Sequence, residues 1–479
     1  MYSFLPFRFC KINSKYFLSN DTGEYVFLEQ NEFQSLINKK IKENSEIYNN
    51  LISQFFIVKP SNLESTIEIL ATKFRTKKNF ILNFTILHMI VPTLKCNSKC
   101  LYCQVSSKDS STKNCTMNFQ TAKKIIHLIF QSRSDNIKIE FQGGEPLLQF
   151  DLIKKIIKYS EKLSKFYHKN LEFVICTNLT LIDEEQLKFI SKHPIWISTS
   201  LDGPKEIHDR NRPLRNSISS FDLFDDKLKL TRSILGIDRI SALLTVTKIG
   251  LSNYREIINE YINHQFHSIF LRALNPFGLA IKNRSELEYS TNEFIEYYKN
   301  SLLYIIQINI DGYFLVEEYS AIILKKILTP FSTAFVDLQS PAGLGLSCAL
   351  YNYDGKIYAS DEGRMLAETG DDTFYLGSIN QDYEEIFSGE KIKNFIKNSI
   401  AETLPECSSC PFVPYCGADP VRNYVEQNDI IGNRMLSNFC HKNRQIIIFL
   451  LEIIEKNDSK IMNVFWSWIT RRSLKQVEL

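Results

Sequence analysis

A chain of 479 residues exceeds what one hydrophobic core usually organises, so two or three domains are expected. Its 44% hydrophobic and 23% charged residues are typical of a globular protein, and a net charge of +3 is too small to indicate nucleic-acid binding. No apolar run reaches the roughly 18 residues of a membrane helix. Polar and basic residues interrupt the N-terminal MYSFLPFRFC, so we expect a cytoplasmic protein without a signal peptide.

The first 80 residues predict a small α+β module. Three short strand-like segments come first, with the sequences FRFCKI, KYFLS and YVFLEQ. A helix is expected over 31–46 and a second one over 61–74. This pattern differs from that of the following residues, so a domain boundary is expected near residue 80.

From about residue 80, short apolar runs alternate with longer amphipathic segments, which is the pattern of βα units on a parallel sheet. Strands are expected at 83–91, 137–142, 171–177, 195–201, 239–247 and 268–274. Helical patterns lie between them at 119–132, 150–167, 183–192, 221–235 and 253–265. Six strands with five helices predict an α/β fold with a partial (β/α)6 barrel, similar to an incomplete TIM barrel.

Cysteine, glycine and polar residues follow the carboxyl ends of these strands. The signals, in chain order, are CNSKCLYC at 96–103, GGEP at 143–146, TN at 177–178 and SLDG at 200–203. Active sites of parallel sheets gather at the carboxyl ends of the strands. These residues are therefore expected to converge on one rim of the sheet.

Three cysteines, Cys96, Cys100 and Cys103, stand together without a fourth ligand beside them. A structural zinc site uses four protein ligands, and the nearby His88 lies inside the first strand pattern. A cubane [4Fe–4S] cluster that is held by three thiolates keeps one iron for an outside molecule. The spacing therefore favours an iron–sulfur cluster that is open to a substrate or cosubstrate.

CxxxCxxC with an aromatic residue before the third cysteine, followed by a strand and GGEP, resembles the radical S-adenosylmethionine (SAM) superfamily. In that superfamily the free iron binds the methionine moiety of SAM, and one electron from the cluster releases a 5′-deoxyadenosyl radical that abstracts a hydrogen atom. The resemblance implies a SAM pocket lined by Tyr102, Gly143, Gly144, Glu145, Pro146, Thr177, Asn178, Ser200, Asp202 and Arg212. Arg212 would pair with the SAM carboxylate. An ordinary turn or surface role is the alternative for each of these residues.

A second group of cysteines resembles the SPASM extension of radical SAM enzymes that modify peptides and proteins. Its members are Cys407, Cys410, Cys416 and Cys440, with Cys348 further upstream. Ser360 and Pro420 stand where the family pattern has cysteines, and both losses fall on one of the family's two auxiliary sites. The resemblance therefore implies one auxiliary [4Fe–4S] cluster with four thiolates, for electron transfer or structural support. A four-cysteine zinc site is the alternative.

Asp361 directly follows Ser360, at a position where some relatives carry a base that accepts a substrate proton. A solvated acid is the alternative. The expected domains are an N-terminal module at 1–80, a radical SAM core at 81–310, a SPASM-like auxiliary Fe–S domain at 311–456 and a basic, aromatic tail at 457–479. The tail contains FWSWITRR, which would dock on a partner or membrane surface or pack its tryptophans in a terminal helix.

Four segments together resemble the B member of the His-Xaa-Ser system radical SAM maturases. They are FLPFRF, LSNDTGEYVFL, SDEGRML and CPFVPYCGADPVRNYVEQ. The resemblance implies a cross-link or dehydrogenation on a ribosomally made peptide or protein with His-Xaa-Ser repeats. It also implies a second radical SAM maturase as partner and an electron donor such as flavodoxin or ferredoxin.

Under this resemblance, the N-terminal module would hold the leader of the substrate by strand addition to an exposed edge, or else cap the barrel. Two other functions are kept open. One is formylglycine formation, as in anaerobic sulfatase maturases, although the losses at Ser360 and Pro420 count against it. The other is a non-catalytic scaffold for another radical SAM protein, and the intact CxxxCxxC argues against it.

Overall fold

The computed structural model describes residues 2–275, 277–278, 280, 283–333 and 335–477. The chain forms two compact units. The sheet unit comprises Leu82–Glu318 and Gly343–Ile396, and the terminal unit comprises Met1–Ile81, Tyr319–Ala342 and Lys397–Leu479. The expected N-terminal module and tail both fall in the terminal unit, whereas the residues expected for the SPASM-like domain are divided between the two units.

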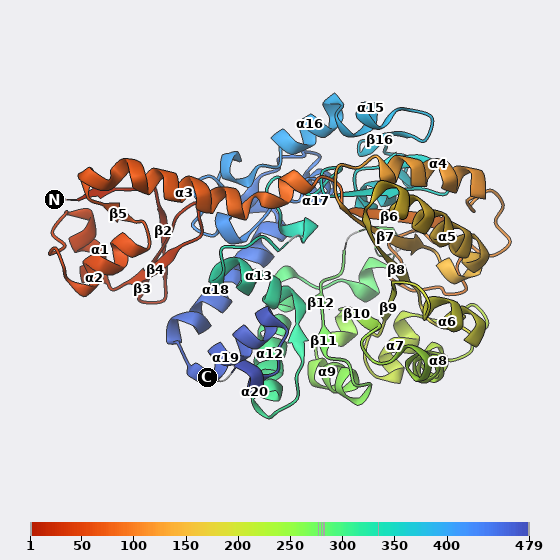
Figure 1. The fold of residues 1–479 in the computed structure, drawn as a ribbon. Helices are drawn as coiled ribbons and strands as arrows, with labels where there is room; N and C mark the ends of the chain where they lie inside the picture. The colour runs from red at the N-terminus through yellow and green to blue at the C-terminus, as the bar shows by residue number, and fades with distance from the viewer. Residues whose placement is uncertain (1, 276, 279, 281–282, 334, 478–479) are drawn as a thin grey trace. The chain divides into compact units, whose positions relative to one another are not determined.

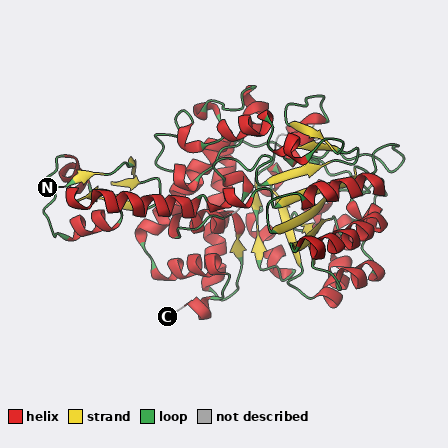
Figure 2. Cartoon of the chain, turned by 45° about the horizontal axis from the view of Figure 1, so that its top comes forward, coloured by secondary structure: helices red, strands yellow, loops and turns green. Residues whose placement is uncertain are grey.

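The sheet unit is built on a nine-stranded sheet in the order β12-β10-β9-β8-β7-β6-β14-β15-β16. Its strands are β6 (Leu87–Thr93), β7 (Asn136–Gly143), β8 (Asn170–Cys176), β9 (Ile195–Ser200), β10 (Ile240–Thr245), β12 (Leu271–Arg272), β14 (Cys348–Tyr351), β15 (Lys356–Tyr358) and β16 (Tyr375–Ser378). All pairs from β12 to β14 are parallel, and β15 and β16 pair antiparallel. Figure 2 shows these strands side by side, with helices along one side of the sheet.

Helices connect the parallel strands as βα units require. The helices of the sheet unit are α4 (Phe119–Phe130), α5 (Phe150–Tyr167), α6 (Glu184–Ile190), α7 (Lys205–Asn211), α8 (Ser220–Leu235), α9 (Tyr254–Asn263), α11 (Arg284–Leu287), α12 (Thr291–Ile310), α14 (Asp361–Ala367), α15 (Tyr383–Phe387) and α16 (Glu390–Lys397). Polar side chains cap the N-termini of several helices. The Asn118 side chain accepts from Thr121 N in α4, and Asp183 and Gln186 form a capping box in α6. Figure 1 shows α4, α5, α6 and α8 on one side of the strands.

The two faces of the parallel strands carry different side chains. On β7, Ile139 and Phe141 are buried, whereas Glu140 and Gln142 line a cavity on the opposite face. Ile197 on β9 is buried in the same way, and its neighbour Ser198 lines the cavity. Because successive side chains of a strand point to opposite faces, the helices cover the apolar face and leave a polar face for a site.

Each of the six strands that the sequence predicts overlaps a parallel strand of this sheet. The first begins at Leu87 rather than at 83, because η2 (Asn79–Asn83) ends inside the expected strand and the backbone then turns at Phe84, where φ is +50°. The last is divided into β11 (Ser268–Ile269), which pairs with β13 (Val316–Glu317), and β12. The strands β14 to β16 and the helix α7 were not predicted, since their short segments carry no clear apolar period.

The terminal unit contains a three-stranded antiparallel sheet of β2 (Arg8–Ile12), β3 (Lys15–Ser19) and β4 (Tyr25–Leu28), with β3 in the centre. We call it the N-terminal sheet. A second pair joins β1 (Ser3–Phe4) to β5 (Ile57–Val58). The helices of this unit are α1 (Gln30–Ile37), α2 (Glu46–Ser53), α3 (Leu63–Lys77), α13 (Glu318–Leu328), α17 (Pro420–Gln427), α18 (Asn438–Lys456), α19 (Ser459–Thr470) and α20 (Leu474–Val477).

The helix expected over 31–46 is wrong in extent. It ends at Ile37 because the backbone turns at Lys39, where φ is +58°. A new helix then begins after Ser45, whose side chain accepts from Tyr48 N. The charged run between the two helices offers no apolar face that would have continued the first one.

The aromatic residues of the tail lie in α19. Phe465 and Trp468 are fully buried, which supports the packing alternative over the docking one for these two side chains. Within the described part of the chain, no helix combines the length and apolarity needed to cross a bilayer.

Candidate active site and auxiliary cysteine centre

The loop after β6 brings Cys96, Cys100 and Cys103 to one cavity of about 260 Å³ in the sheet unit. The loop is closed by local backbone bonds: Cys103 N donates to Cys100 O at 3.2 Å, and Ser98 N donates to the Cys96 sulfur at 3.4 Å. Leu101 N donates to Asn211 O at 2.9 Å, which ties the loop to the end of α7. The three thiols are therefore held by backbone contacts on either side of the loop.

Gly143 and Gly144 allow the GGEP segment to approach the residues before the cysteine loop. A Cβ on Gly144 would lie 2.0 Å from Lys95 O, and one on Gly143 would lie 2.5 Å from Thr93 O. Gly143 also has a φ of +120°, a conformation that favours glycine. Gly144 N then donates to Thr93 O at 2.9 Å. The close approach seen in this structure is thus between two backbone segments.

Glu145 links GGEP to the end of β8. Its buried carboxylate accepts hydrogen bonds from Thr177 Oγ1 at 2.7 Å, Asn178 N at 2.8 Å and Leu147 N at 3.0 Å. Burial raises the pKa of Glu145 although these donors lower it. Pro146 is buried at the start of η3 (Pro146–Gln149) and does not line the cavity.

Asn178 carries this network on to the cysteine loop. Its Nδ2 donates to Asn97 Oδ1 at 2.8 Å and to Ser98 Oγ at 2.9 Å. Asn97 Nδ2 in turn donates to Thr180 Oγ1 at 2.8 Å. Side chains from two strand ends therefore fix the loop that carries Cys96.

Arg212 faces the same cavity and is held by two buried residues. Its Nη1 donates to the Tyr102 hydroxyl at 2.5 Å, and that hydroxyl donates to the Asp202 carboxylate at 2.7 and 2.9 Å. Burial alone would lower the pKa of Arg212, but Tyr102, Cys100 and Asp202 raise it well above its usual range. Asp202 is buried behind the cavity, so it positions Tyr102 rather than lining the site.

Asp361 is the first residue of α14 and lines the cavity with Met365. The Ser360 side chain caps this helix by accepting from Gly363 N at 3.1 Å. Buried Arg364 donates to Val105 O at 2.8 Å and pairs with Glu368 at 3.2 Å. Because Val105 follows Cys103 in the same loop, α14 holds Asp361 next to the cysteines.

The three thiols fit a cluster better than a single ion. Among the described residues, no group of three or more His, Cys, Asp or Glu side chains is arranged to hold a single metal ion. Cys96, Cys100 and Cys103 instead share the wall of one cavity, which suits a cubane whose cysteines bind separate iron atoms. Burial raises the pKa of Cys96 to about 12 and of Cys100 to about 11, so ligation to a cation would be needed to hold them as thiolates at neutral pH.

The structure adds cavity residues that the sequence analysis missed. Cys176 lines the cavity and donates to Glu140 Oε1 at 3.2 Å. Other additions are Ser98, Gln104, Val105, Ser107, Gln142, Ser198, Thr199, Leu243, Thr245, Arg272 and Met365. Several stand at alternate positions of predicted strands, such as 140 and 142 or 243 and 245. Because successive side chains of a strand point to opposite faces of the sheet, this alternation at the strand ends could have predicted these cavity residues.

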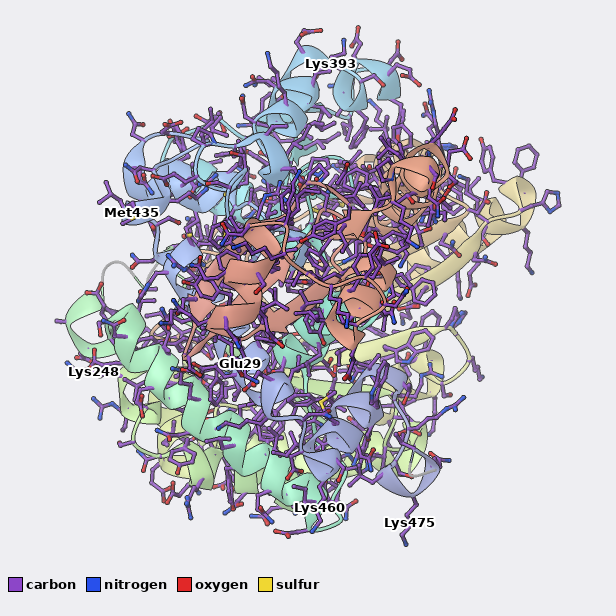
Figure 3. All side chains as sticks on the ribbon, turned by 90° about the vertical axis from the view of Figure 1, so that its left-hand side faces the viewer. Glu29, Lys248, Lys393, Met435, Lys460 and Lys475 are labelled. Carbon is purple, nitrogen blue, oxygen red and sulfur yellow. The ribbon has the colours of Figure 1, made fainter. Side chains whose placement is uncertain are left out.

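The terminal unit contains a second thiol site. Cys407, Cys410, Cys416 and Cys440 all line one cavity of about 360 Å³. Met435, labelled in Figure 3, also lines it and is 81% exposed, so the cavity opens to solvent there. We call this site the auxiliary centre.

The auxiliary centre carries donors and cations that suit thiolates. Arg434 Nε donates to the Cys407 sulfur at 3.1 Å, and Arg444 also lines the cavity. Ser437 caps α18 by accepting from Cys440 N at 3.2 Å. Burial raises the pKa of Cys416 to about 12 and of Cys440 to about 11, although positive neighbours lower both. The donor set fits a fully thiolate-ligated cluster.

The two positions where the SPASM pattern has cysteines begin helices here. Ser360 caps α14, and Pro420 is the first residue of α17. Cys348 is buried in β14 and directs its sulfur to Gly343 O at 3.5 Å. These residues therefore have local structural roles in the fold.

Residues 90–248 match the family model described as Radical SAM superfamily. The chain is 39% identical over 130 residues to the uncharacterized protein MJ0907 of Methanocaldococcus jannaschii, a match that covers 27% of this chain and only 43% of that protein. It is 24% identical over 349 residues to the cysteine-type anaerobic sulfatase-maturating enzyme of Clostridium perfringens (strain 13 / Type A). This second match covers 70% of this chain and 89% of the enzyme.

Solved structures share the fold at lower sequence identity. Native anSMEcpe with bound AdoMet and the Cp18Cys peptide is similar with a TM-score of 0.65 and 20% identity, over 80% of this chain and 99% of that chain. Streptococcus suis SuiB bound to the precursor peptide SuiA is similar with a TM-score of 0.53 and 14% identity, over 90% of this chain and 98% of that chain. These likenesses concern the arrangement of the backbone.

Proposed function

We propose that this protein, a member of the radical SAM superfamily, is a maturase that cross-links or dehydrogenates a ribosomally made peptide or protein with His-Xaa-Ser repeats. The observation that carries the proposal is the convergence of three thiols, Arg212 and Asp361 on one cavity. The superfamily uses a [4Fe–4S] cluster and SAM, and the three thiols are the ligands that we assign to that cluster. The four segments that resemble the B member of the His-Xaa-Ser system support the choice of substrate.

The residues around the cavity divide into binding and positioning roles. When bound, the cluster and SAM supply reductive cleavage of SAM and abstraction of a hydrogen atom. Arg212 is placed to hold the SAM carboxylate, and the Tyr102 and Asp202 hydrogen bonds keep its guanidinium at the cavity wall. Glu145 and Asn178 fix the loops that form the wall.

Asp361 is the proposed base. It lines the cavity at the N-terminus of α14, and Arg364 on the same helix holds that helix to the cysteine loop. A carboxylate at this position can accept the proton that a substrate loses when its radical is oxidised. Cys407, Cys410, Cys416 and Cys440 would hold an auxiliary cluster, which would supply electron transfer or structural support. The proposed electron donor is a flavodoxin or ferredoxin.

Peptides are the proposed substrate class because two neighbours of this fold are solved with peptides bound, anSMEcpe with the Cp18Cys peptide and SuiB with SuiA. The N-terminal sheet is the proposed place for the leader of the substrate, which would add a strand to an edge of the sheet. A second radical SAM maturase is the proposed partner. None of these partners is needed for the first test of SAM chemistry.

The test is the intact mass of a His-Xaa-Ser peptide after anaerobic co-expression with this chain or with its Cys100→Ala variant. We expect loss of mass equivalent to two hydrogens only with the intact chain, and fragmentation would then locate the new bond. An unchanged peptide in the presence of the second maturase, from a chain that cleaves SAM, would contradict the substrate assignment.

Formylglycine formation is the second candidate. The match to the cysteine-type anaerobic sulfatase-maturating enzyme covers 89% of that enzyme, which favours it. Ser360 and Pro420 at the two auxiliary positions weigh against it. Incubation with a cysteine- or serine-containing sulfatase peptide, followed by labelling of aldehydes, separates the two candidates, because only formylglycine formation creates a carbonyl.

A further inference from the structure

The loop of the auxiliary centre is held by polar contacts with the N-terminal sheet. We call residues 407–416 the cysteine segment. Arg8 Nε on β2 donates to Ser408 O at 2.5 Å, between the first two cysteines of the segment. The buried Ser19 hydroxyl on β3 donates to Pro411 O. Two strands of the sheet thus satisfy backbone carbonyls of the cysteine segment.

Aromatic packing reinforces these hydrogen bonds. The rings of Phe17 and Phe412 stack with centroids 5.8 Å apart and an interplanar angle of 18°. The buried Tyr415 hydroxyl donates to Gly23 O at 3.0 Å, in the turn between β3 and β4. Two buried side chains from the second half of the cysteine segment therefore pack on the sheet.

The N-terminal sheet uses one face for this contact and the other for its own core. Tyr16 on β3 stacks on Phe33 of α1 at 4.0 Å, and Leu18 belongs to the same hydrophobic core. Phe17 and Ser19 alternate with them and point to the cysteine segment. Because alternate residues of a strand point to opposite faces, the cysteine segment covers the face that the helices leave open.

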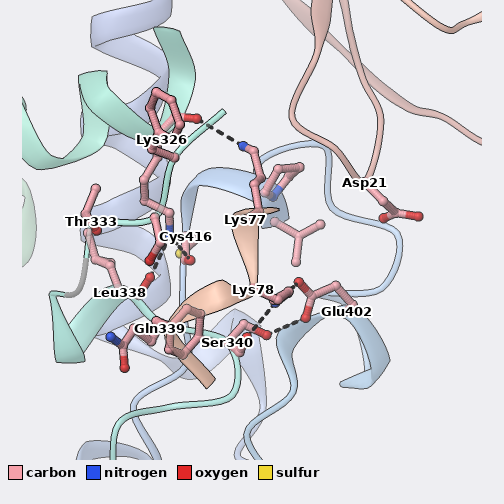
Figure 4. Close-up of a pocket in the computed structure, with 15 residues that line it drawn as sticks. Asp21, Lys77, Lys78, Lys326, Thr333, Leu338, Gln339, Ser340, Glu402 and Cys416 are labelled. Carbon is pink, nitrogen blue, oxygen red and sulfur yellow. Dashed lines mark hydrogen bonds and ion pairs between the residues drawn. The ribbon is translucent and has the colours of Figure 1, made fainter. Parts of the chain in front are cut away.

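Lysines hold the cysteine segment to two helices. Figure 4 shows Lys326 of α13 reaching the carbonyls of Leu338 and Cys416, at 2.6 and 2.7 Å. Lys77 of α3 donates to Lys326 O at 3.1 Å and lies over the Tyr415 ring at 5.6 Å from its centroid. These contacts link the last cysteine of the segment to α13 and, through Lys326, to α3.

The cysteine segment has little regular structure of its own, since only η7 (Val413–Tyr415) interrupts its turns. Binding of its thiols to one cluster would therefore add a strong constraint on its conformation. We infer that the auxiliary centre, when filled, fixes the cysteine segment and thereby holds the N-terminal sheet in its folded position. Loss of the cluster then loosens the sheet that we propose for leader binding. This inference rests on the auxiliary cluster of the proposed function, but it holds whatever the substrate is.

Hydrogen–deuterium exchange of the full chain, kept anaerobic and without substrate, tests it. The variant Cys407→Ala/Cys410→Ala removes two ligands of the auxiliary centre, and Cys100→Ala/Cys103→Ala is the matched control at the other centre. We expect amides of residues 8–28 to exchange at least about tenfold faster in the first variant and at the wild-type rate in the second. Equal exchange in wild type and the first variant would overturn the inference, and so would an equal rise in both variants.

A second variant covers the case in which loss of the cluster unfolds the whole unit. Arg8→Ala/Ser19→Ala leaves all four thiols in place, so iron content should stay at the wild-type level while exchange over 8–28 rises. Lys11→Ala, an exposed position on β2, is its control and should change neither. Unchanged exchange in Arg8→Ala/Ser19→Ala would overturn the structural link. Failure to modify a His-Xaa-Ser peptide would leave these readouts untouched and would count only against the proposed function.

Discussion

The two thiol sites of this chain differ in what completes them. In the sheet unit, three cysteines share a cavity with Arg212 and Asp361, at the carboxyl ends of parallel strands. In the terminal unit, four cysteines share a cavity whose cysteine segment packs on a β-sheet through Phe412 and Tyr415. The first site exposes the polar side chains of Arg212 and Asp361 to a cavity that a ligand could enter. The cysteine segment of the second site instead packs against other residues of the chain.

At each site, the number of thiols and the side chains around them indicate the same role. A three-thiolate cubane keeps an iron for a cosubstrate, and the first site supplies a guanidinium for a carboxylate. A four-thiolate cubane keeps none, and the second site has Arg434 directed at a sulfur instead. Chemistry is therefore expected at the first site, and support or electron transfer at the second.

The largest effect is expected from removing one thiol at each site. Cys100→Ala should reduce SAM cleavage to background, because the proposed SAM-binding cluster would lose one of its three thiolate ligands. Cys410→Ala should lose iron but keep measurable SAM cleavage. Anaerobic reconstitution, iron analysis and quantification of 5′-deoxyadenosine check both variants. Equal loss of SAM cleavage in the two variants would contradict this division of roles, because the two sites would then act as one functional unit.

Asp361→Asn should separate chemistry on SAM from chemistry on the substrate. If Asp361 accepts a substrate proton, product formation should fall by about 10²- to 10⁴-fold while SAM cleavage stays near the wild-type rate. Glu362→Gln, on the next residue of α14, is the matched control and should change neither rate. Intact-mass analysis of the peptide and 5′-deoxyadenosine measured in the same reactions give the two numbers. Parallel loss of both would show that Asp361 acts on SAM or on folding.

The sequence predicted the sheet and the rim because parallel βα units leave strong local signals. Alternating apolar runs predicted six strands. Because active sites of parallel sheets lie at the carboxyl ends of the strands, Cys96, Thr177 and Ser200 could be predicted to lie at one site. It could not reveal Cys176 as a cavity residue, since a thiol at a strand end reads as an ordinary buried side chain. Nor could it show that Pro146 and Asp202 lie outside the cavity wall, because packing and hydrogen bonds with residues distant in the sequence decide that.

The terminal unit was harder to read from the sequence. Its three segments lie far apart in the chain, and the contacts that join them, such as Arg8 with Ser408, span nearly the whole sequence. The local periodicity of apolar residues cannot predict contacts between residues so far apart in the sequence. The resemblance of the cysteine spacing to the SPASM pattern predicted the four cysteines that line the auxiliary centre. Candidate ligands can be recognised by residue type, whereas Phe17 and Ser19 look like ordinary strand residues.

Acid should weaken the sheet unit, because two of its buried histidines stay neutral in the folded chain. Burial lowers the pKa of His88 and of His208 to about 3 from an ordinary value of 6.5. The unfolded chain then binds more protons than the folded one between these values, so stability is lost as pH falls from 6.5 toward 3. At pH 5 each histidine should cost about 2 kcal/mol. Hydrogen exchange of β6 to β9 at pH 7 and 5, with His88→Leu as the comparison, measures it. A pH-independent sheet unit would contradict the neutral assignment.

The smallest effect concerns Ser360, which stands where the SPASM pattern has a cysteine. Ser360→Ala should cost the sheet unit about 1 kcal/mol, because α14 loses the hydroxyl that accepts from Gly363 N. Ser360→Cys restores the family's residue, yet iron content should not rise, since Pro420 still occupies the other lost position and begins α17. Iron analysis and urea unfolding of both variants check this. An added cluster in Ser360→Cys would mean that Cys348 and one new thiol suffice, and the chain would then hold a third site where the structure places only a helix cap.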